Sequence, residues 1–300
     1  MISTVKNSAL AWTLAVLSVT AAVVLLMRLL HTAVEIPVAA AASTGISLGF
    51  GLLFLCVIVA LDRTKLHRMA GTKTMWAWAV VAGGLIGPLI AIYSNDKFDF
   101  EIIRVSDPET YRAWGDAVYG PLVEEWIKGV LALAVILLFR ERIVRPTQAF
   151  FIGAFTGLGF QVTEDIWYAI TSAYVDVNSD LSGGVALSLV RGLFGLISHW
   201  TYTGVVAVGL AYLLGVTFHS ANGAPPRRGR AIVRAIGLCA LAYLTHGLWN
   251  SPLTFGLPAV ATTAAKLAIS LTAFVIFYVW LMRHEKRTVA YAQPPKVTEA

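Results

Sequence analysis

Long apolar segments alternate with short polar segments along the whole chain. An α-helix needs about 20 mostly apolar residues to cross the hydrocarbon core of a bilayer, and roughly eight of the segments approach or exceed that length. They occupy about residues 9–30, 45–61, 75–93, 119–139, 149–171, 186–214, 231–250 and 258–282. The pattern therefore predicts an all-α, polytopic membrane protein with about eight transmembrane helices.

The first apolar segment is longer than the core of about 7–15 residues found in a secretory signal peptide, so we expect it to be retained as a span. No internal repeat or low-complexity tract separates the spans from one another. We therefore predict a single integral membrane domain over residues 1–300, which ends in a cytoplasmic tail at 283–300.

The composition agrees with a membrane protein and excludes other classes. The chain is 57% hydrophobic and 13% charged, which is about half the charge of an average soluble domain. This deficit argues against a cytosolic enzyme and against a disordered chain. The two cysteines, Cys56 and Cys239, both lie inside apolar segments. They are too few for a disulfide scaffold or a cysteine zinc site, and we interpret them as small core residues.

The net charge of +6 comes from basic residues in short segments between the spans. These segments follow the second, fourth, sixth and eighth spans, at 63–73, 140–145, 227–230 and 283–287. The loop that we expect at 94–118 carries more acidic than basic residues. Because Lys and Arg mark cytoplasmic loops, both termini are predicted to be cytoplasmic. The basic charge therefore indicates topology in a lipid bilayer and not nucleic-acid binding.

Several ionisable residues lie inside the predicted spans. Each such group costs about 2.5–3.5 kcal/mol at the centre of a membrane helix on insertion scales, so it is expected to have a functional or structural partner. With the topology above, those of spans four to seven all fall in the outer half of the membrane or near its middle. We therefore expect them to meet in one site. They are Glu124, Glu125, Lys128, Glu164, Arg191, His199 and His246.

Helical spacing adds detail to this set. Lys128 lies within one turn of both Glu124 and Glu125, so it can neutralise either carboxylate. Four residues of the sixth span follow one another at four-residue intervals and are predicted to share a single helical face: Arg191, Gly195, His199 and Thr203. Alternative interpretations are a structural ion pair for the lysine and hydrogen-bonded packing roles for the histidines.

Two glycine pairs are also spaced at one helical turn. Gly45 and Gly49 enclose a serine in the pattern of a serine-hydrolase pentapeptide, but they lie inside a helix and not on a turn after a strand. Gly153 and Gly157 have the same spacing. We interpret both pairs as faces for close helix packing. No His-Glu-x-x-His motif of a zinc protease occurs in the sequence.

Four short motifs occur in order on four spans. They are Val123-Glu124-Glu125-Trp126-Ile127-Lys128, Phe160-Gln161-Val162-Thr163-Glu164, Arg191 through His199 to Thr203, and His246-Gly247-Leu248-Trp249-Asn250. Together they resemble the motifs of the PrsW family of intramembrane proteases. That family is part of a superfamily with the CAAX prenyl endopeptidases and bacteriocin-processing enzymes. The resemblance covers residues 75–252, which we expect to be the catalytic core. In the CAAX relatives the second motif ends in histidine, so the role of Glu164 does not transfer directly from them.

The resemblance implies a peptidase, whose chemistry needs an activated water and a stabiliser for the tetrahedral oxyanion. We expect Glu124 to be the general base, with Glu125 as the alternate. Glu164 is expected to position the water or hold a second proton, and His199 to orient or share that proton.

The seventh span is expected to supply the oxyanion donors, His246 and Asn250. The supporting residues, which do not react, are expected to be Lys128, Arg191 and Thr203. The resemblance leaves open whether the water is activated by glutamate alone or by a metal ion such as zinc. The candidate metal ligands are Glu124, Glu164, His199 and His246.

The same resemblance implies an integral membrane protein as substrate, of which an anti-sigma factor is one example, cut near the outer leaflet of a bacterial plasma membrane. Two other functions fit buried Glu, His and Lys residues. One is a proton- or ion-coupled transporter, although no paired interrupted helices occur in related halves. The other is a non-catalytic membrane scaffold. Cleavage of a membrane protein by the purified chain distinguishes the peptidase from both.

Overall fold

The computed structural model describes residues 8–62, 73–143, 145–215 and 227–292. Within these ranges every regular element is helical. The elements are α2 (Ala9–Ala33), α3 (Pro37–Asp62), α4 (Lys73–Val81), the π-helical turn η1 (Ala82–Ile86), α5 (Gly87–Ile103), α6 (Pro108–Leu138), the 3₁₀ turn η2 (Arg140–Arg142), α7 (Pro146–Val175), α8 (Asp180–Phe194), α9 (His199–Leu213), α10 (Arg228–Asn250) and α11 (Ala259–Ala292). The basic segment predicted at 63–73 and the tail predicted at 283–300 lie partly outside the described residues.

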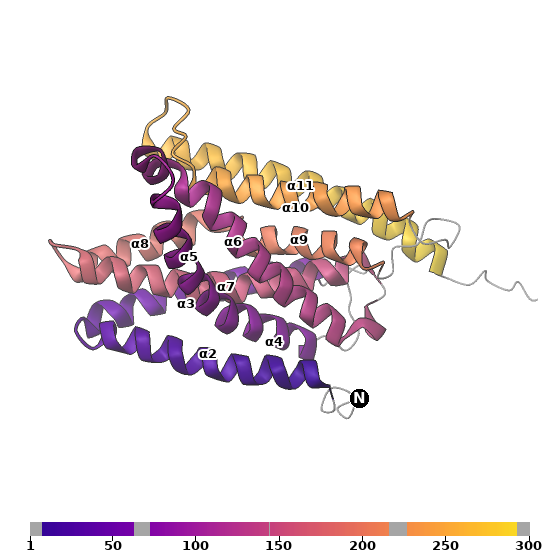
Figure 1. The fold of residues 1–300 in the computed structure, drawn as a ribbon, viewed down its shortest axis with the longest axis horizontal. Helices are drawn as coiled ribbons and strands as arrows, with labels where there is room; N and C mark the ends of the chain where they lie inside the picture. The colour runs from indigo at the N-terminus through magenta and orange to yellow at the C-terminus, as the bar shows by residue number, and fades with distance from the viewer. Residues whose placement is uncertain (1–7, 63–72, 144, 216–226, 293–300) are drawn as a thin grey trace, which may run out of the picture.

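The long helices form a bundle, with α2 along one edge and α10 and α11 along the opposite edge (Figure 1). The middle of the bundle is α7, which packs against α3, α4, α6, α8 and α9. Every side chain of its first half, from Pro146 to Gln161, is buried. Phe150, Phe151 and Phe155 on this half are at most 1% exposed. The other helices are therefore arranged around α7.

The all-helical prediction is confirmed for the described residues, since each of the eight apolar segments is mostly helical. Among the described residues, five helices are long and apolar enough to cross a membrane, and α8 with α9 makes a sixth if the bent pair is one span. The five lie at 9–33, 37–62, 73–95, 228–250 and 259–285. The total of eight is not confirmed, because α6 and α7 do not meet the same standard. α6 carries the charged residues Glu124, Glu125 and Lys128. α7 carries Glu164 and Asp165.

The sixth predicted span is not a continuous helix. α8 ends at Phe194, α9 begins at His199, and the two helices are bent by 45° relative to each other. The prediction that Arg191, His199 and Thr203 share a single helical face is therefore wrong. Arg191 belongs to α8, and the two other residues belong to α9.

The break between α8 and α9 is stabilised from α7. Gly195 O, which a continuous helix would bond internally, accepts hydrogen bonds from Gln161 Nε2 at 2.9 Å and from Ser198 Oγ at 3.0 Å. Both partners are buried. Because a buried carbonyl without a partner is costly, these two bonds make the break tolerable in the interior of the bundle.

The segment at 94–118, expected to be a loop, is mostly helical. α5 continues to Ile103, and α6 starts at Pro108, so the two helices enclose only a short turn. Asp107 caps α6 by accepting a hydrogen bond from Thr110 N at 2.8 Å. This bond, with the adjacent helix N-terminus, holds the pKa of the exposed Asp107 carboxyl below its usual value. The loop prediction was wrong because capping residues and charged residues are common at exposed helix ends as well as in loops.

The two glycine pairs have different surroundings. A Cβ on Gly157 would collide with the backbone of His199, and one on Gly153 would collide with Thr203 O and Ala207. The close helix packing predicted for Gly153 and Gly157 is therefore confirmed, and the partner helix is α9. Around Gly45 and Gly49, no atom of the described residues lies within 4 Å of an added Cβ. The packing role predicted for that pair is wrong within this chain.

The prediction for the cysteines is also wrong in detail. Both are free thiols, but Cys56 is exposed on α3 and Cys239 is only partly buried on α10. Apolar segments in a membrane protein present side chains outward as well as inward, so an apolar neighbourhood in the sequence does not establish burial in the protein core.

Candidate active site

The predicted site residues converge from five helices. Glu124, Glu125 and Lys128 come from α6, and Glu164 comes from α7. The rest of the set is Arg191 on α8, His199 and Thr203 on α9, and His246 and Asn250 on α10. The convergence predicted from matched depth is therefore present, while the chemical role of each residue remains a prediction.

Lys128 lies at the centre of the site and is fully buried. Its Nζ is 2.7 Å from Glu125 Oε1 and 3.4 Å from Glu124 Oε2. The same Nζ is 2.7 Å from His199 Nδ1 and lies over the Phe160 ring at 4.3 Å from its centroid. The ammonium group thus neutralises part of the buried carboxylate charge, as its spacing on α6 predicted.

Each histidine is oriented by its own glutamate. His246 Nδ1 is 2.9 Å from Glu125 Oε1, and His199 Nε2 is 2.9 Å from Glu164 Oε2. Because a carboxylate accepts hydrogen bonds, these contacts assign the ring protons to His246 Nδ1 and His199 Nε2. The other nitrogen of each ring faces Glu124 Oε2, at 3.8 Å in both cases. Glu124 therefore lies between two imidazole lone pairs.

Glu124 is the least engaged of the three glutamates. Its nearest cation is Lys128 Nζ at 3.4 Å. Glu125, in contrast, also accepts from Thr203 Oγ1 at 3.4 Å, in addition to its shorter contacts with Lys128 and His246. Adjacent residues of a helix point about 100° apart, so Glu124 and Glu125 cannot both face the same point. These contacts favour Glu124 as the residue that faces the open space.

The site also offers a possible set of metal ligands. One atom each from Glu124, His199 and His246 lie within 4.8 Å of one another, and all three residues are buried. Two imidazoles and one carboxylate, with a fourth coordination position left open, are typical of catalytic zinc. In a histidine that binds zinc, the ring nitrogen that does not bind the metal usually donates a hydrogen bond, often to a carboxylate. The residues therefore fit zinc. Since Lys128 Nζ occupies the lone pair of His199 Nδ1, this contact has to break for the metal to bind. Glu164, the fourth predicted ligand, lies behind His199 instead.

Arg191 holds two acidic groups together at the edge of the site. Its Nη2 is 2.5 Å from Glu164 Oε2, and its Nε is 2.5 Å from Asp165 Oδ1. The guanidinium also lies 4.7 Å from the centroid of the Tyr168 ring. Asp165 directly follows Glu164 in the sequence. Its role as the second anchor of Arg191 was missed, because the contact depends on how α8 packs against α7.

The substitution Arg191→Gln is expected to lower the free energy of unfolding by about 3–5 kcal/mol, because it leaves two mostly buried carboxylates without their cation. Thermal unfolding in detergent, followed by tryptophan fluorescence, measures the effect. The matched control is Arg104→Gln, since Arg104 and Glu101 form an exposed pair at 3.5 Å. An exposed pair contributes about 1 kcal/mol or less. Equal effects of the two substitutions would contradict the anchoring role of Arg191.

Asn250 connects α10 to α6. Its Nδ2 donates to Asp116 O at 3.0 Å, and two turns earlier on α10 Tyr243 Oη donates to Val118 O at 3.1 Å. Both bonds reach α6 just before Pro121, where the missing N–H weakens the helix. The carboxamide has a second N–H, and a Cβ placed on Gly120 would lie 3.7 Å from Asn250 Nδ2 and 3.9 Å from Glu124 Oε1. The amide and the carboxylate therefore lie near the same point of the cleft.

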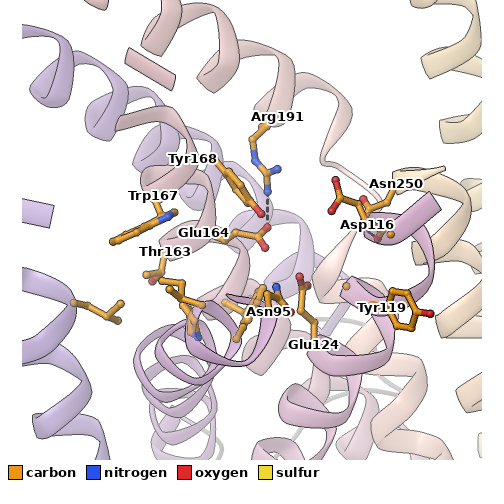
Figure 2. Close-up of a pocket in the computed structure, with 17 residues that line it drawn as sticks. Asn95, Asp116, Tyr119, Glu124, Thr163, Glu164, Trp167, Tyr168, Arg191 and Asn250 are labelled. Carbon is orange, nitrogen blue, oxygen red and sulfur yellow. Dashed lines mark hydrogen bonds and ion pairs between the residues drawn. The ribbon is translucent and has the colours of Figure 1, made fainter. Parts of the chain in front are cut away.

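A cleft of about 470 Å³ opens onto these groups. Figure 2 shows Glu124 and Glu164 in its middle, with Trp167 and Thr163 on one side and Asp116, Tyr119 and Asn250 on the other. Such a volume is within the range of about 300–1,000 Å³ found for ligand sites. A smaller adjoining cavity of about 70 Å³ leads to His199 and His246. The aromatic wall residues were not predicted, because aromatic residues within a span indicate packing as readily as binding.

Comparison with known families agrees with the motifs. The sequence profile of a family described as "PrsW family intramembrane metalloprotease" matches residues 71–282. No curated protein and no solved structure is significantly similar to the chain.

Proposed function

Because the chain belongs to the PrsW family of intramembrane metalloproteases, we propose that it hydrolyses a peptide bond of an integral membrane protein at Glu124. Family membership and the apolar helices make it a membrane-embedded peptidase. The observation that best supports this location of the site is the arrangement of Glu124, His199 and His246. These three residues come from three helices and share one buried space beside a cleft.

In the proposed reaction, water enters the space between Glu124 and the two imidazoles, and Glu124 removes its proton. A base has to be free to accept a proton, and Glu124 is less engaged than Glu125 or Glu164. The resulting hydroxide attacks the carbonyl carbon of the substrate. Glu124 then returns the proton to the leaving amine. Glu125 and Glu164 keep the rings of His246 and His199 oriented during these steps.

The oxyanion is proposed to form next to Asn250. One N–H of its carboxamide holds Asp116 O, and the other is left to donate to the developing negative charge. His246 Nε2 presents a lone pair in the resting tautomer, so it accepts a hydrogen bond from the water first. It donates to the oxyanion only while it holds the proton that Glu124 took from the water, and it passes that proton back to Glu124 before the amine leaves. Lys128 and Arg191 keep the surrounding carboxylates ionised without reacting.

Zinc-assisted hydrolysis is a second candidate, favoured by the fit of Glu124, His199 and His246 to that metal. When bound, zinc would lower the pKa of the water and polarise the substrate carbonyl. The roles of Glu125 and Glu164 in orienting the imidazoles are the same in both candidates.

The proposed activity is tested with the purified full-length protein and a detergent extract of bacterial membrane proteins. Mass spectrometry of newly formed N-termini is expected to show cleavage that depends on time and on enzyme. A transporter or a scaffold produces no new N-termini. If folded wild-type protein produces no new N-termini, the peptidase proposal is contradicted.

We also propose that all eight segments span the membrane, with both termini in the cytoplasm and the cleft near the outer leaflet. In a variant without Cys56 and Cys239, cysteines at Asn178 and Thr254 are expected to react with an impermeant maleimide added to intact cells. A cysteine at Glu141 is expected to react only after lysis. All three positions are exposed in the structure. Labelling of position 141 in intact cells would contradict this orientation.

A further inference from the structure

The walls of the cleft differ in chemistry from one side to the other. α6, α8 and α10 contribute polar and charged groups, among them Asp116, Arg191 and Asn250. α2 and α5 contribute Leu25, Pro88, Ala91 and Ile92, and one turn beyond Ala91 α5 also contributes the polar Asn95. The first four residues offer only apolar side-chain atoms. The cleft therefore has a polar wall and an aliphatic wall that is bordered by Asn95, and Glu124 lines the same cavity.

Leu25 reaches the aliphatic wall because of the way α2 docks. The buried face of α2 repeats at three- and four-residue intervals, through Leu14, Ser18, Ala21 and Leu25. This face packs against η1 and the start of α5. Leu25 is the last buried residue of the face and is only 3% exposed. Arg28 follows one turn later and lies over the Tyr93 ring of α5 at 4.5 Å, which fixes this end of α2 beside the cleft.

The position of Leu25 in the sequence sets it apart from the proposed reacting groups. The family profile begins at residue 71, so α2 lies outside the matched region, whereas the proposed reacting groups lie inside it. A wall from α2 can therefore change which substrate is accepted without altering the hydrolytic residues.

The size of the cleft limits what can lie against this wall. One turn of α-helix, about 5.4 Å long and 10–12 Å across with its side chains, fills on the order of 500 Å³. The cleft is about 470 Å³, so it holds no more than a short segment of a substrate. In an extended peptide, side chains alternate between opposite sides. A side chain next to the cleaved bond can therefore point toward the aliphatic wall while the backbone carbonyl faces Asn250.

We propose that Leu25, Pro88, Ala91 and Ile92 form a subsite for an aliphatic side chain of the substrate, beside the peptide bond that is cleaved at Glu124. This inference deepens the proposed function and rests on it. A branched aliphatic side chain buries its surface against four apolar residues there, whereas a charged side chain loses its hydration without gaining a partner. Leu25 sets the depth of the subsite.

The test compares the cleavage specificity of the wild type with Leu25→Ala and Leu25→Trp, on detergent-extracted bacterial membrane proteins. Aligned N-termini of the products show which residues flank the cut. The wild type is expected to favour Leu, Ile or Val at one flanking position. Leu25→Ala is expected to increase cleavage beside Phe or Trp at that position about tenfold or more, because one methylene in an apolar pocket changes discrimination about 10–200-fold. Leu25→Trp is expected to restrict cleavage to substrates with Gly or Ala at the same position.

The matched control is Leu26→Trp, since Leu26 is the next residue on α2 and is 57% exposed. The Leu26→Trp enzyme is expected to show the same cleavage specificity as the wild type. Active Leu25 variants with an unchanged profile would overturn the subsite and leave the proposed function intact. Loss of all cleavage in both Leu25 variants, with an active Leu26 control, would make Leu25 a purely structural residue and would also overturn it. A wild type that does not cleave would contradict the proposed function, and the subsite with it.

Discussion

Replacing Glu124 by glutamine is expected to lower the rate of proteolysis by about two orders of magnitude or more. The amide keeps the shape of the side chain but cannot accept the proton of the attacking water, and general base catalysis typically contributes about 10²–10⁴-fold. The amount of folded protein in the membrane should change little, because a neutral amide is less costly to bury than a carboxylate. The initial rate at which new N-termini appear measures the effect.

Glu109→Gln is the matched control for this prediction, because Glu109 lies on the same helix and is exposed. It should cleave at the wild-type rate. Glu125→Gln should also be impaired, since Glu125 orients His246 and pairs with Lys128. Near-wild-type cleavage by both the Glu124 and the Glu125 variant would show that neither carboxylate is the base.

The substitution His246→Ala is expected to reduce the rate by about 10²–10³-fold, the usual cost of losing one group that stabilises an oxyanion. In the proposed mechanism without a metal, the metal content measured by elemental analysis is the same in the wild type and the variant. His31→Ala, at an exposed position of α2, is the control and should change neither quantity.

The zinc-assisted candidate predicts a different result for the same variants. The wild type would contain about one zinc ion per chain, and both His246→Ala and His199→Ala would lose it, because sites with three protein ligands tolerate little loss. Full activity of a chelator-treated wild type without metal would contradict the zinc candidate. Stoichiometric zinc that is lost in both variants would contradict the metal-free mechanism.

Much of the fold and of the site follows from sequence features that act locally. Apolar length predicted where helices form, and the cost of a buried charge predicted that Glu124, Glu164, His199 and His246 would have partners. Helical spacing placed Lys128 next to both of its carboxylates. These inferences succeeded because each depends only on helical periodicity and on the free energy of burial.

The remaining features depend on contacts between distant segments. The apolar residues around 195–198 suggested a continuous span, whereas the chain breaks there because Gln161 of α7 satisfies Gly195 O. Gly195 and Ser198 are residue types common at helix ends, so a signal for the break was present but ambiguous. The docking of Leu25 beside the cleft and the pairing of Asp165 with Arg191 have no such signal, because both arise only when separate helices pack.

The most direct test of intramembrane hydrolysis at Glu124 is the position of the cut in substrates reconstituted with the enzyme in liposomes. Wild-type protein is predicted to produce new N-termini within about two helical turns of one end of a substrate's transmembrane segment, and Glu124→Gln is predicted to produce none. Cuts confined to soluble domains, or the same cuts with the Glu124→Gln enzyme, would contradict hydrolysis at this site.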